Sequence, residues 1–211
     1  MQCIAFVSMK GGVGKTTSAI HYAYWASING CKTVLIDDDA NRSSIKWALR
    51  AGENPKFKAP FEVVPFAKMA KAAQGMELVV LDTQASIGHD VIKDLAEDCE
   101  LIVIPSKPDI DSAAAAHETA LKVKEANGNY TILLTDCPTG SSKTGAETGA
   151  DLAEVGLNVL SQRIRRGAGV GHASLAGSTV AQQTGKYRMP WRDYEIAFNE
   201  ILKIYGLPGN G

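Results

Sequence analysis

A glycine-rich loop near the start of the chain constrains its fold more than any other feature. Residues 8–17 read Ser-Met-Lys-Gly-Gly-Val-Gly-Lys-Thr-Thr, and they follow an apolar run, residues 3–7, that is typical of a buried strand. The next residues, 16–28, are rich in alanine and aromatic side chains and are typical of a helix. Glycines let successive backbone N–H groups turn into one cavity, and a helix N-terminus adds a positive dipole end. The pattern therefore predicts a phosphate-binding loop.

Two lysines distinguish this loop from a plain glycine turn between a strand and a helix. Lys15 is placed to reach the outer phosphates of a nucleotide, and the Thr16 hydroxyl is placed to hold Mg²⁺. The general phosphate-loop pattern has a glycine where this chain has Met9, and here a second lysine, Lys10, precedes a pair of glycines. The plain glycine turn is the alternative, and the Gly-Lys-Thr at residues 14–16 disfavours it.

Short apolar runs alternate with helix-like segments along the whole chain. The predicted strands are residues 3–7, 33–36, 61–64, 78–81, 101–104, 130–134 and 157–160. The predicted helices are residues 16–28, 43–51, 67–74, 89–98, 112–126, 146–155 and 193–204. This alternation predicts an α/β fold with a doubly wound, mainly parallel sheet and helices on both faces. Pro60 marks residues 61–64 as an edge strand. We expect one domain over residues 1–211, with a frayed tail at 206–211.

Carboxylates follow the predicted strands at the edge of the sheet where the phosphate loop lies. Asp37, Asp38 and Asp39 follow one strand, and Asp82 follows another. Ligands of such sheets bind beyond the carboxyl ends of the strands. Asp82 has the position of an aspartate that holds Mg²⁺ through a water, and three adjacent carboxylates would repel one another without a cation. The alternatives are a capping aspartate and an acidic, solvated loop.

The run from Lys10 to Thr17 resembles the deviant Walker A box of the ParA/MinD ATPases. The resemblance implies an ATP-sandwich homodimer in which Lys10 reaches across the interface to the partner's nucleotide. It assigns ATP binding to Lys10, Gly11, Gly12, Val13, Gly14, Lys15, Thr16 and Thr17. Composition and spacing alone predict only a nucleotide-binding protein.

Residues 37–39 resemble the D-x-D of switch I in the same family. The resemblance implies that Asp37 lies near the metal with Thr16 and Asp82, and that Asp39 orients the attacking water. The expected catalytic residues are therefore Lys10, Lys15 and Asp39. The family usually continues with Pro-Gln where this chain has Ala40-Asn41, and Gln84 in the predicted switch II, residues 83–88, is a weaker candidate for orienting water.

Residues 104–114 and 161–180 resemble this family's nucleotide and interface regions. Asp111 is expected either to contact the partner subunit or, as the preferred alternative, to cap the helix that follows. Thr135-Asp136 is expected to edge the base pocket. The backbone after residue 160 is expected to line the adenine pocket, as in small plasmid-partition ParA proteins.

Charge is unevenly distributed along a chain whose net charge is −1. Residues 161–211 contain seven Lys or Arg against three Asp or Glu, a balance of +4, which leaves −5 for residues 1–160. Such asymmetry suggests a basic face, although an ordinary solvated surface is the alternative. In the related proteins, basic residues of this region bind DNA without sequence preference. The candidates here are Arg163, Arg165, Arg166, Lys186 and Arg188.

The resemblance as a whole implies a ParA-type ATPase that uses ATP and Mg²⁺ and positions or segregates DNA cargo, in plasmid partition or conjugative transfer. Its expected partners are a second copy of itself, non-specific DNA, and a centromere-binding or transfer-complex adaptor that stimulates slow hydrolysis. We expect a cytoplasmic, nucleoid-associated protein with no membrane span or signal peptide, and cysteines too scattered for a metal site. The alternatives are a MinD-like positioning ATPase on a membrane surface and a small-molecule synthetase on the same scaffold.

Overall fold

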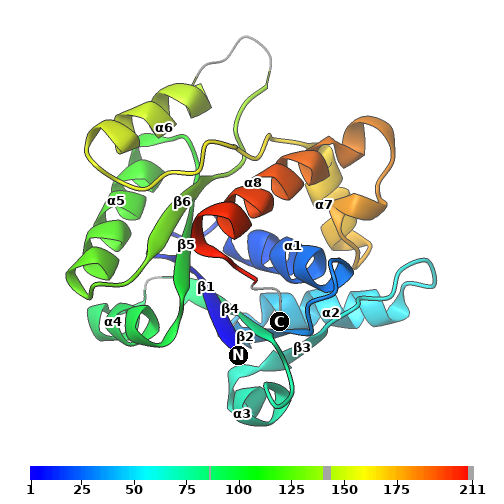
Figure 1. Cartoon of the computed structure of the whole chain (residues 1–211). Coiled ribbons are helices and arrows are strands. Elements are labelled where there is room, and N and C mark those ends of the chain that lie inside the picture. The colour runs from blue at the N-terminus through cyan, green and yellow to red at the C-terminus, as the bar shows by residue number, and fades with distance from the viewer. Residues whose placement is uncertain (86, 140–143, 209–211) are drawn as a thin grey trace.

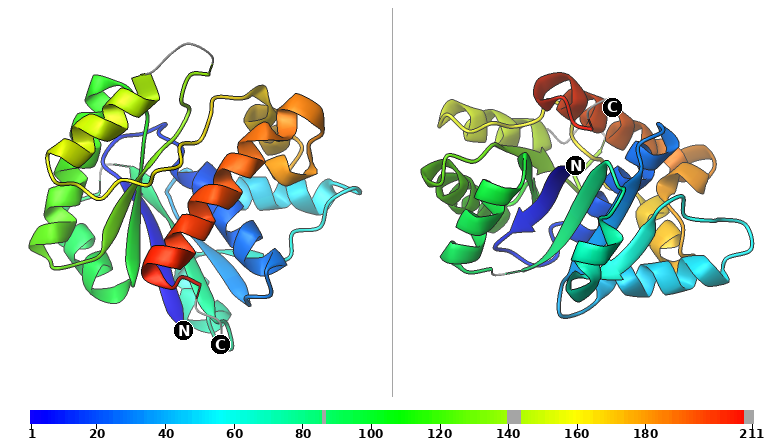
Figure 2. Two further views of the ribbon diagram at one scale, coloured as in Figure 1. Left: turned by 45° about the horizontal axis from the view of Figure 1, so that its top comes forward. Right: turned by 60° about the horizontal axis from the view of Figure 1, so that its bottom comes forward.

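A six-stranded parallel sheet covered by helices on both faces forms the molecule (Figures 1 and 2). The computed structural model describes residues 1–85, 87–139 and 144–208. Ser86 of the predicted switch II and the last three residues of the predicted tail lie outside this range. The strands are β1 (Gln2–Ser8), β2 (Thr33–Asp38), β3 (Glu62–Pro65), β4 (Leu78–Ala85), β5 (Leu101–Ser106) and β6 (Tyr130–Leu134). Their order in the sheet is β3-β2-β4-β1-β5-β6, so β3 is the edge strand that Pro60 predicts.

The helices lie in two layers. They are α1 (Lys15–Ile28), α2 (Ser43–Glu53), α3 (Met69–Ala72), α4 (His89–Asp98), α5 (Ile110–Glu125), α6 (Thr144–Glu154), α7 (Ala168–Leu175) and α8 (Met189–Tyr205). Three 3₁₀ turns complete the set: η1 (Phe66–Lys68), η2 (Val180–Gln182) and η3 (Gly185–Arg188). Helices α1, α2, α7 and α8 cover one face of the sheet, and α4, α5 and α6 cover the other (Figure 1).

The alternation of side chains along β1 explains why both faces need helices. Ile4 and Phe6 pack into the core beneath α1 and α8, whereas Cys3, Ala5 and Val7 pack into the core beneath α4 and α5. Successive residues of a strand point to opposite faces, so a strand that is apolar at every position has to be covered twice. This confirms the predicted fold class.

The predicted strand at residues 157–160 is wrong. The segment makes only one bridge to β6, at Ile132 and Val159. Two backbone hydrogen bonds hold it there, from Ile132 N to Asn158 O (2.8 Å) and from Leu160 N to Ile132 O (2.9 Å). The chain then leaves the ladder, because residues beyond 160 turn along the carboxyl end of β6 towards the glycine loop.

The C-terminal helix begins earlier than the sequence pattern predicts. It starts at Met189 with a proline in its first turn, a position that proline favours. Ile196 and Ile204 of this helix are 45% and 58% exposed, whereas Tyr194, Ala197, Phe198 and Ile201 belong to the core on this face of the sheet.

The predicted frayed tail is also wrong where the structure describes it. The side chain of Leu207 is 1% exposed and belongs to the core beneath α1 and α8. The chain is therefore anchored past the end of α8.

Candidate nucleotide-binding site

The glycine loop joins β1 to α1 at the carboxyl edge of the sheet. Gly12 and Gly14 have φ angles of 73° and 93°, a left-handed region that glycine adopts without strain. A Cβ on Gly14 would lie 3.4 Å from Thr135 Oγ1. The Thr135 hydroxyl donates to the carbonyl oxygen of Val13 at 2.7 Å and so fastens the loop to the end of β6.

The two lysines of the loop have different surroundings. Lys15 is 7% exposed, and its Nζ donates to the carbonyl oxygen of Lys10 at 3.3 Å. Burial lowers the pKa of Lys15, an effect that the nearby carboxylates of Asp82 and Asp39 oppose. Lys10 lies instead at the rim of the loop, with its Nζ 3.0 Å from Asp109 Oδ1 and its side chain 35% exposed. Only Lys15 therefore lies where a nucleotide of the same subunit would place its phosphates.

Two buried carboxylates stand side by side next to this loop. Asp37 of β2 and Asp82 of β4 are partners in the strand register, and both are completely buried. The Oδ2 of Asp82 accepts a hydrogen bond from Ser44 Oγ at 2.7 Å, whereas its Oδ1 has no hydrogen-bond partner. Burial raises the pKa of Asp82 to about 7, although the Ser44 and Thr16 hydroxyls oppose the shift.

This arrangement fits a divalent cation. A buried carboxylate oxygen without a partner is costly, and coordination to a cation would satisfy it. Among the described residues no group of three or more His, Cys, Asp or Glu is arranged to hold a metal. Mg²⁺ needs no such cage, because it is usually bound through one or two carboxylates, waters and phosphate oxygens. Asp82 and Thr16 are the residues that would hold it.

Asp37 and Asp39 are both engaged with backbone N–H groups. Asp37 accepts from the N–H of Asp39 (3.0 Å) and from the N–H of Ile45 (2.9 Å). Asp39, which is half-buried, accepts from the N–H and the side-chain amide of Asn41. The carboxylate of Asp37 therefore stabilises the turn into α2 beside Asp82, and Asp39 stays close enough to Lys15 to affect its pKa.

A cavity of about 170 Å³, called the base cavity below, lies between the glycine loop and the segment that follows β6. It is lined by Gly12, Val13, Gly14, Thr17, Lys107, Thr135, Asp136, Ile164, Arg165, Arg166, Gly167, Val170 and Tyr194. Asp136 bridges its mouth, because it accepts from Arg166 at 2.9 and 3.2 Å and lies 3.6 Å from Lys107 Nζ. The residues expected to edge a base pocket are thus brought together next to the phosphate loop.

The five predicted DNA-binding residues are in two different situations. Arg165 forms a bidentate ion pair with Asp193, in which Nε and Nη2 each lie 2.6 Å from a carboxylate oxygen, and Arg166 is paired with Asp136. The other three, Arg163, Lys186 and Arg188, are exposed and form no ion pair with the described residues. Lys186 lies 5.6 Å from the ring centroid of Tyr187.

The helix cap at α5 is Asp109 and not Asp111, which corrects the preferred expectation. Asp109 accepts from the N–H of Ser112 at 2.9 Å and also pairs with Lys10, whereas Asp111 lies in the first turn with its carboxylate 3.9 Å from Lys10 Nζ.

Sequence reasoning also missed Ser44. Its place after the acidic run is the only signal that could have indicated a role, and serine in that position is common at helix starts. Gln84 lies exposed at the end of β4.

The chain is similar to proteins that distribute or partition cellular cargo. A family described as an AAA domain matches residues 1–144. A maintenance of carboxysome distribution protein A from Gloeobacter kilaueensis is 26% identical over 201 residues, which cover 94% of this chain and 93% of that protein.

Solved structures share the fold over nearly the whole length. A putative plasmid partition protein from Borrelia burgdorferi bound to AMPPNP has a TM-score of 0.74 and 17% identity, covering 96% of this chain and 98% of that one. Cyanothece McdA, as an Asp-to-Ala variant in complex with ATP, has a TM-score of 0.73 and 15% identity, covering 98% and 96%.

Within the described residues, every helix is too short or too polar to cross a membrane. The glycine loop with its second lysine, the six-stranded parallel sheet and the family match agree with one another. This chain belongs to the ParA/MinD family of ATPases.

Proposed function

We propose that this protein positions cargo by an ATP-driven cycle of dimerisation and DNA binding. ATP and Mg²⁺ close a two-fold dimer, the dimer binds DNA without sequence preference, and slow hydrolysis releases it. The observation that carries the proposal is the placement of Lys10 at the rim of the loop, where its half-exposed ammonium pairs with Asp109 while the side chain of Lys15 is buried. The partition and carboxysome-distribution proteins to which the chain is similar support the choice of cargo positioning.

Within each subunit, the nucleotide phosphates would lie against the loop N–H groups and the ammonium of Lys15. Mg²⁺, held by Thr16 and Asp82, would supply charge neutralisation at the phosphates. Asp39 would orient the attacking water, and its present hydrogen bonds to Asn41 are short-range ones that rotation of the side chain can exchange. Lys10 would leave Asp109 and contact the nucleotide of the partner subunit.

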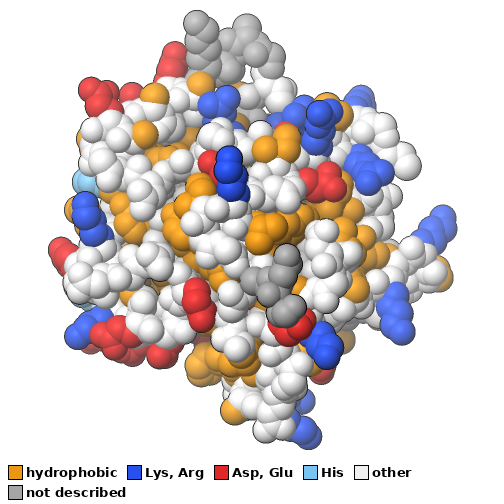
Figure 3. Space-filling model, in the orientation of Figure 1, with side chains coloured by type: hydrophobic (Ala, Val, Ile, Leu, Met, Phe, Trp, Pro, Cys, Tyr) orange, Lys and Arg blue, Asp and Glu red, His pale blue; other side chains and the backbone are white. Residues whose placement is uncertain are grey.

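The DNA-binding face would consist of Arg163, Lys186 and Arg188. Lysine and arginine side chains gather on the side of the molecule where α2 and α7 lie, and acidic side chains gather over α4 (Figure 3). A two-fold dimer doubles the charges on such a face, and affinity for phosphates depends steeply on the number of charges neutralised. Dimerisation alone would therefore switch DNA binding on. An adaptor protein would select the cargo and stimulate hydrolysis in a nucleoid-associated complex.

Binding to a random-sequence duplex tests the proposal. We expect wild-type protein to bind only with ATP and Mg²⁺, and its affinity to fall steeply with added salt. The variant R163Q/K186Q/R188Q should lose about tenfold or more in affinity and keep ATP-driven dimerisation.

The matched control is K68Q/K71Q/K124Q, which removes three exposed charges elsewhere. Equal binding by the two triple variants would remove this face from the mechanism. Absence of wild-type binding with every nucleotide would contradict the proposed DNA step, and vesicles of anionic lipid would then be the next surface to test.

A further inference from the structure

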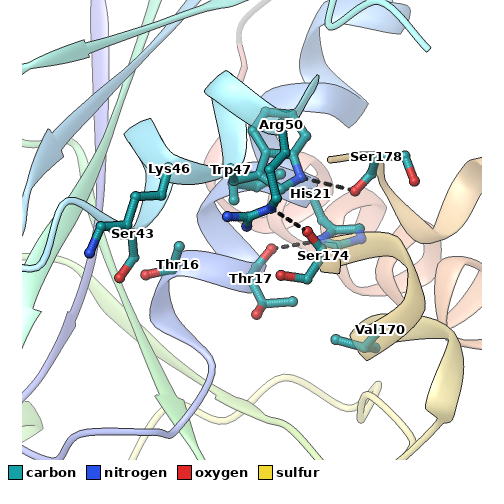
Figure 4. A pocket seen from close by; sticks show the side chains of 11 residues that line it. Thr16, Thr17, His21, Ser43, Lys46, Trp47, Arg50, Val170, Ser174 and Ser178 are labelled. Atoms are coloured by element: carbon teal, nitrogen blue, oxygen red, sulfur yellow. Dashed lines mark hydrogen bonds between the residues drawn. The ribbon is translucent and has the colours of Figure 1, made fainter. Parts of the chain in front are cut away.

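A pocket of about 320 Å³ lies between α1, α2 and α7 (Figure 4), and it shares Thr17 and Val170 with the base cavity. Its polar lining comes mainly from Thr16, Thr17, Ser43, Lys46, Arg50, Ser174 and Ser178. Trp47 and His21 also line it. Thr16 and Thr17 of the glycine loop form one end of the lining, so the pocket adjoins the proposed nucleotide site, whereas its α2 and α7 residues have no role in the proposed nucleotide functions.

The wall formed by α7 is held firmly against α2. Gly177, just after α7, has a φ of 58°, and a Cβ there would lie 2.3 Å from the backbone nitrogen of Ala51. Two side chains of α2 also donate to this segment: Trp47 Nε1 to the carbonyl oxygen of Ser178 (3.0 Å) and Arg50 Nε to that of Ser174 (3.0 Å). The pocket is therefore formed by tight backbone packing before any ligand arrives.

The pocket is positively charged. Lys46 and Arg50 are four residues apart on one face of α2 and extend along the pocket, Lys46 beside Ser43 and Arg50 above Thr17 and Ser174 (Figure 4). Neither forms an ion pair with a carboxylate of the described residues, and no carboxylate lines the pocket.

His21 adds no charge to the pocket and has no free nitrogen for a ligand. Its Nε2 accepts from the N–H of Val180 at 3.0 Å, so Nδ1 carries the proton and donates to the carbonyl oxygen of Thr17 at 2.6 Å. The histidine is thus a neutral part of the floor. The two cations of α2 are left as the groups that define what the pocket attracts.

We propose that this pocket binds a small phosphorylated molecule, separate from the nucleotide on the glycine loop. The Arg50 guanidinium keeps its terminal nitrogens for a bidentate contact with phosphate oxygens, because only Nε is used by Ser174. The ammonium of Lys46 and the hydroxyls of Ser43 and Ser174 supply further donors. The volume is at the lower end of the range for small-molecule sites. A concave pocket with a floor of Trp47 and His21 suits a compact ligand better than the convex backbone of a DNA duplex.

The test follows the Nε–H signal of Arg50 by ¹H–¹⁵N NMR while inorganic phosphate and then pyrophosphate are added at constant ionic strength. The glycine loop is blocked in advance with ADP, and the titration is repeated in K15A, whose glycine loop lacks its main phosphate ligand. We expect a saturable shift in both proteins and none when chloride replaces phosphate. The variant K46Q should weaken binding at least tenfold, whereas K56Q/K58Q, which removes two exposed lysines of the loop after α2, should not.

Three outcomes overturn the proposal. The first is the absence of a saturable shift with either anion, and the second is equal weakening by K46Q and K56Q/K58Q. The third is a shift produced by duplex DNA but by neither small anion, which would assign the pocket to the DNA backbone. None of these results depends on whether the protein dimerises with ATP.

Discussion

At the scale of single residues, buried polar groups explain both the stability of the site and its chemistry. Asp82 keeps a buried oxygen without a partner, and that unsatisfied oxygen is what indicates a cation. Asp193 is equally buried, but Arg165 binds both of its oxygens. Two aspartates with similar burial therefore have different roles, and their partners decide which.

The Arg165–Asp193 pair is expected to contribute strongly to stability. Replacing Arg165 with Ala leaves the buried carboxylate of Asp193 with the backbone N–H of residue 165 but without its charged partner, and we expect a loss of about 3 kcal/mol in unfolding free energy. Replacing Arg166 with Ala breaks a more exposed pair with Asp136 and should destabilise the fold clearly less than replacing Arg165 does. Urea unfolding at neutral pH measures both values. If the two variants were equally stable, Asp193 would have to be satisfied in another way.

His21 is expected to make the protein less stable in mild acid. Burial lowers its pKa from 6.5 to about 4, so the unfolded chain takes up a proton at a higher pH than the folded one. The stability that neutral His21 contributes is present above pH 6.5 and is lost as the pH falls towards 4, by up to about 3 kcal/mol. Titration of the His21 ring by NMR gives the folded pKa directly. A pKa near 6.5 would contradict a buried ring whose two nitrogens are both hydrogen-bonded.

At the scale of elements, the sequence pattern predicts the parts of the fold whose side chains follow a clear period. The six strands of the sheet are apolar at nearly every position, and α4 and α5 follow helical spacing, so both kinds of element were predicted correctly. Helix α7 was missed, because the run Gly-Ala-Gly-Val-Gly at residues 167–171 has low helix propensity. Its helical form depends on packing against α2 and η3, which a local pattern cannot express.

The site shows the same limit. The glycine loop, Asp37 and Asp82 each directly follow a predicted strand, so a local pattern identifies each of them, and the structure brings Asp37 and Asp82 together. The ion pairs of Arg165 with Asp193 and of Lys10 with Asp109 join residues far apart in the chain. No spacing rule connects such residues, so the sequence alone counted Arg165 among the DNA-binding charges.

Helix α7 provides a direct test of this packing. A Cβ on Gly169 would lie 1.9 Å from the carbonyl oxygen of Tyr187 in η3, whereas nothing lies within 4 Å of a Cβ on Gly171. Gly169→Ala should therefore cost about 2 kcal/mol or more through overpacking. Gly171→Ala should be neutral or stabilising by up to about 1 kcal/mol, because alanine is the better helix former. Thermal unfolding of both variants checks this; equal effects would show that α7 does not pack on η3 as described.

At the scale of the whole molecule, the proposed dimer requires that one subunit act on the nucleotide of another. In the single chain Lys10 pairs with Asp109 at a half-exposed position. Exposed ion pairs are worth about 1 kcal/mol or less, so Lys10 can leave this partner at little cost. A triphosphate in a second subunit would offer it a far more highly charged partner. In the proposed dimer, the loop would provide one lysine for each side of the interface.

Sedimentation of the wild type, Lys10→Ala and Lys15→Ala with ATP and Mg²⁺ tests this account most directly, with nucleotide binding measured in parallel. We expect wild type to dimerise, Lys15→Ala to bind no nucleotide and stay monomeric, and Lys10→Ala to bind ATP but stay monomeric. A Lys10→Ala protein that dimerises as fully as wild type would contradict the account.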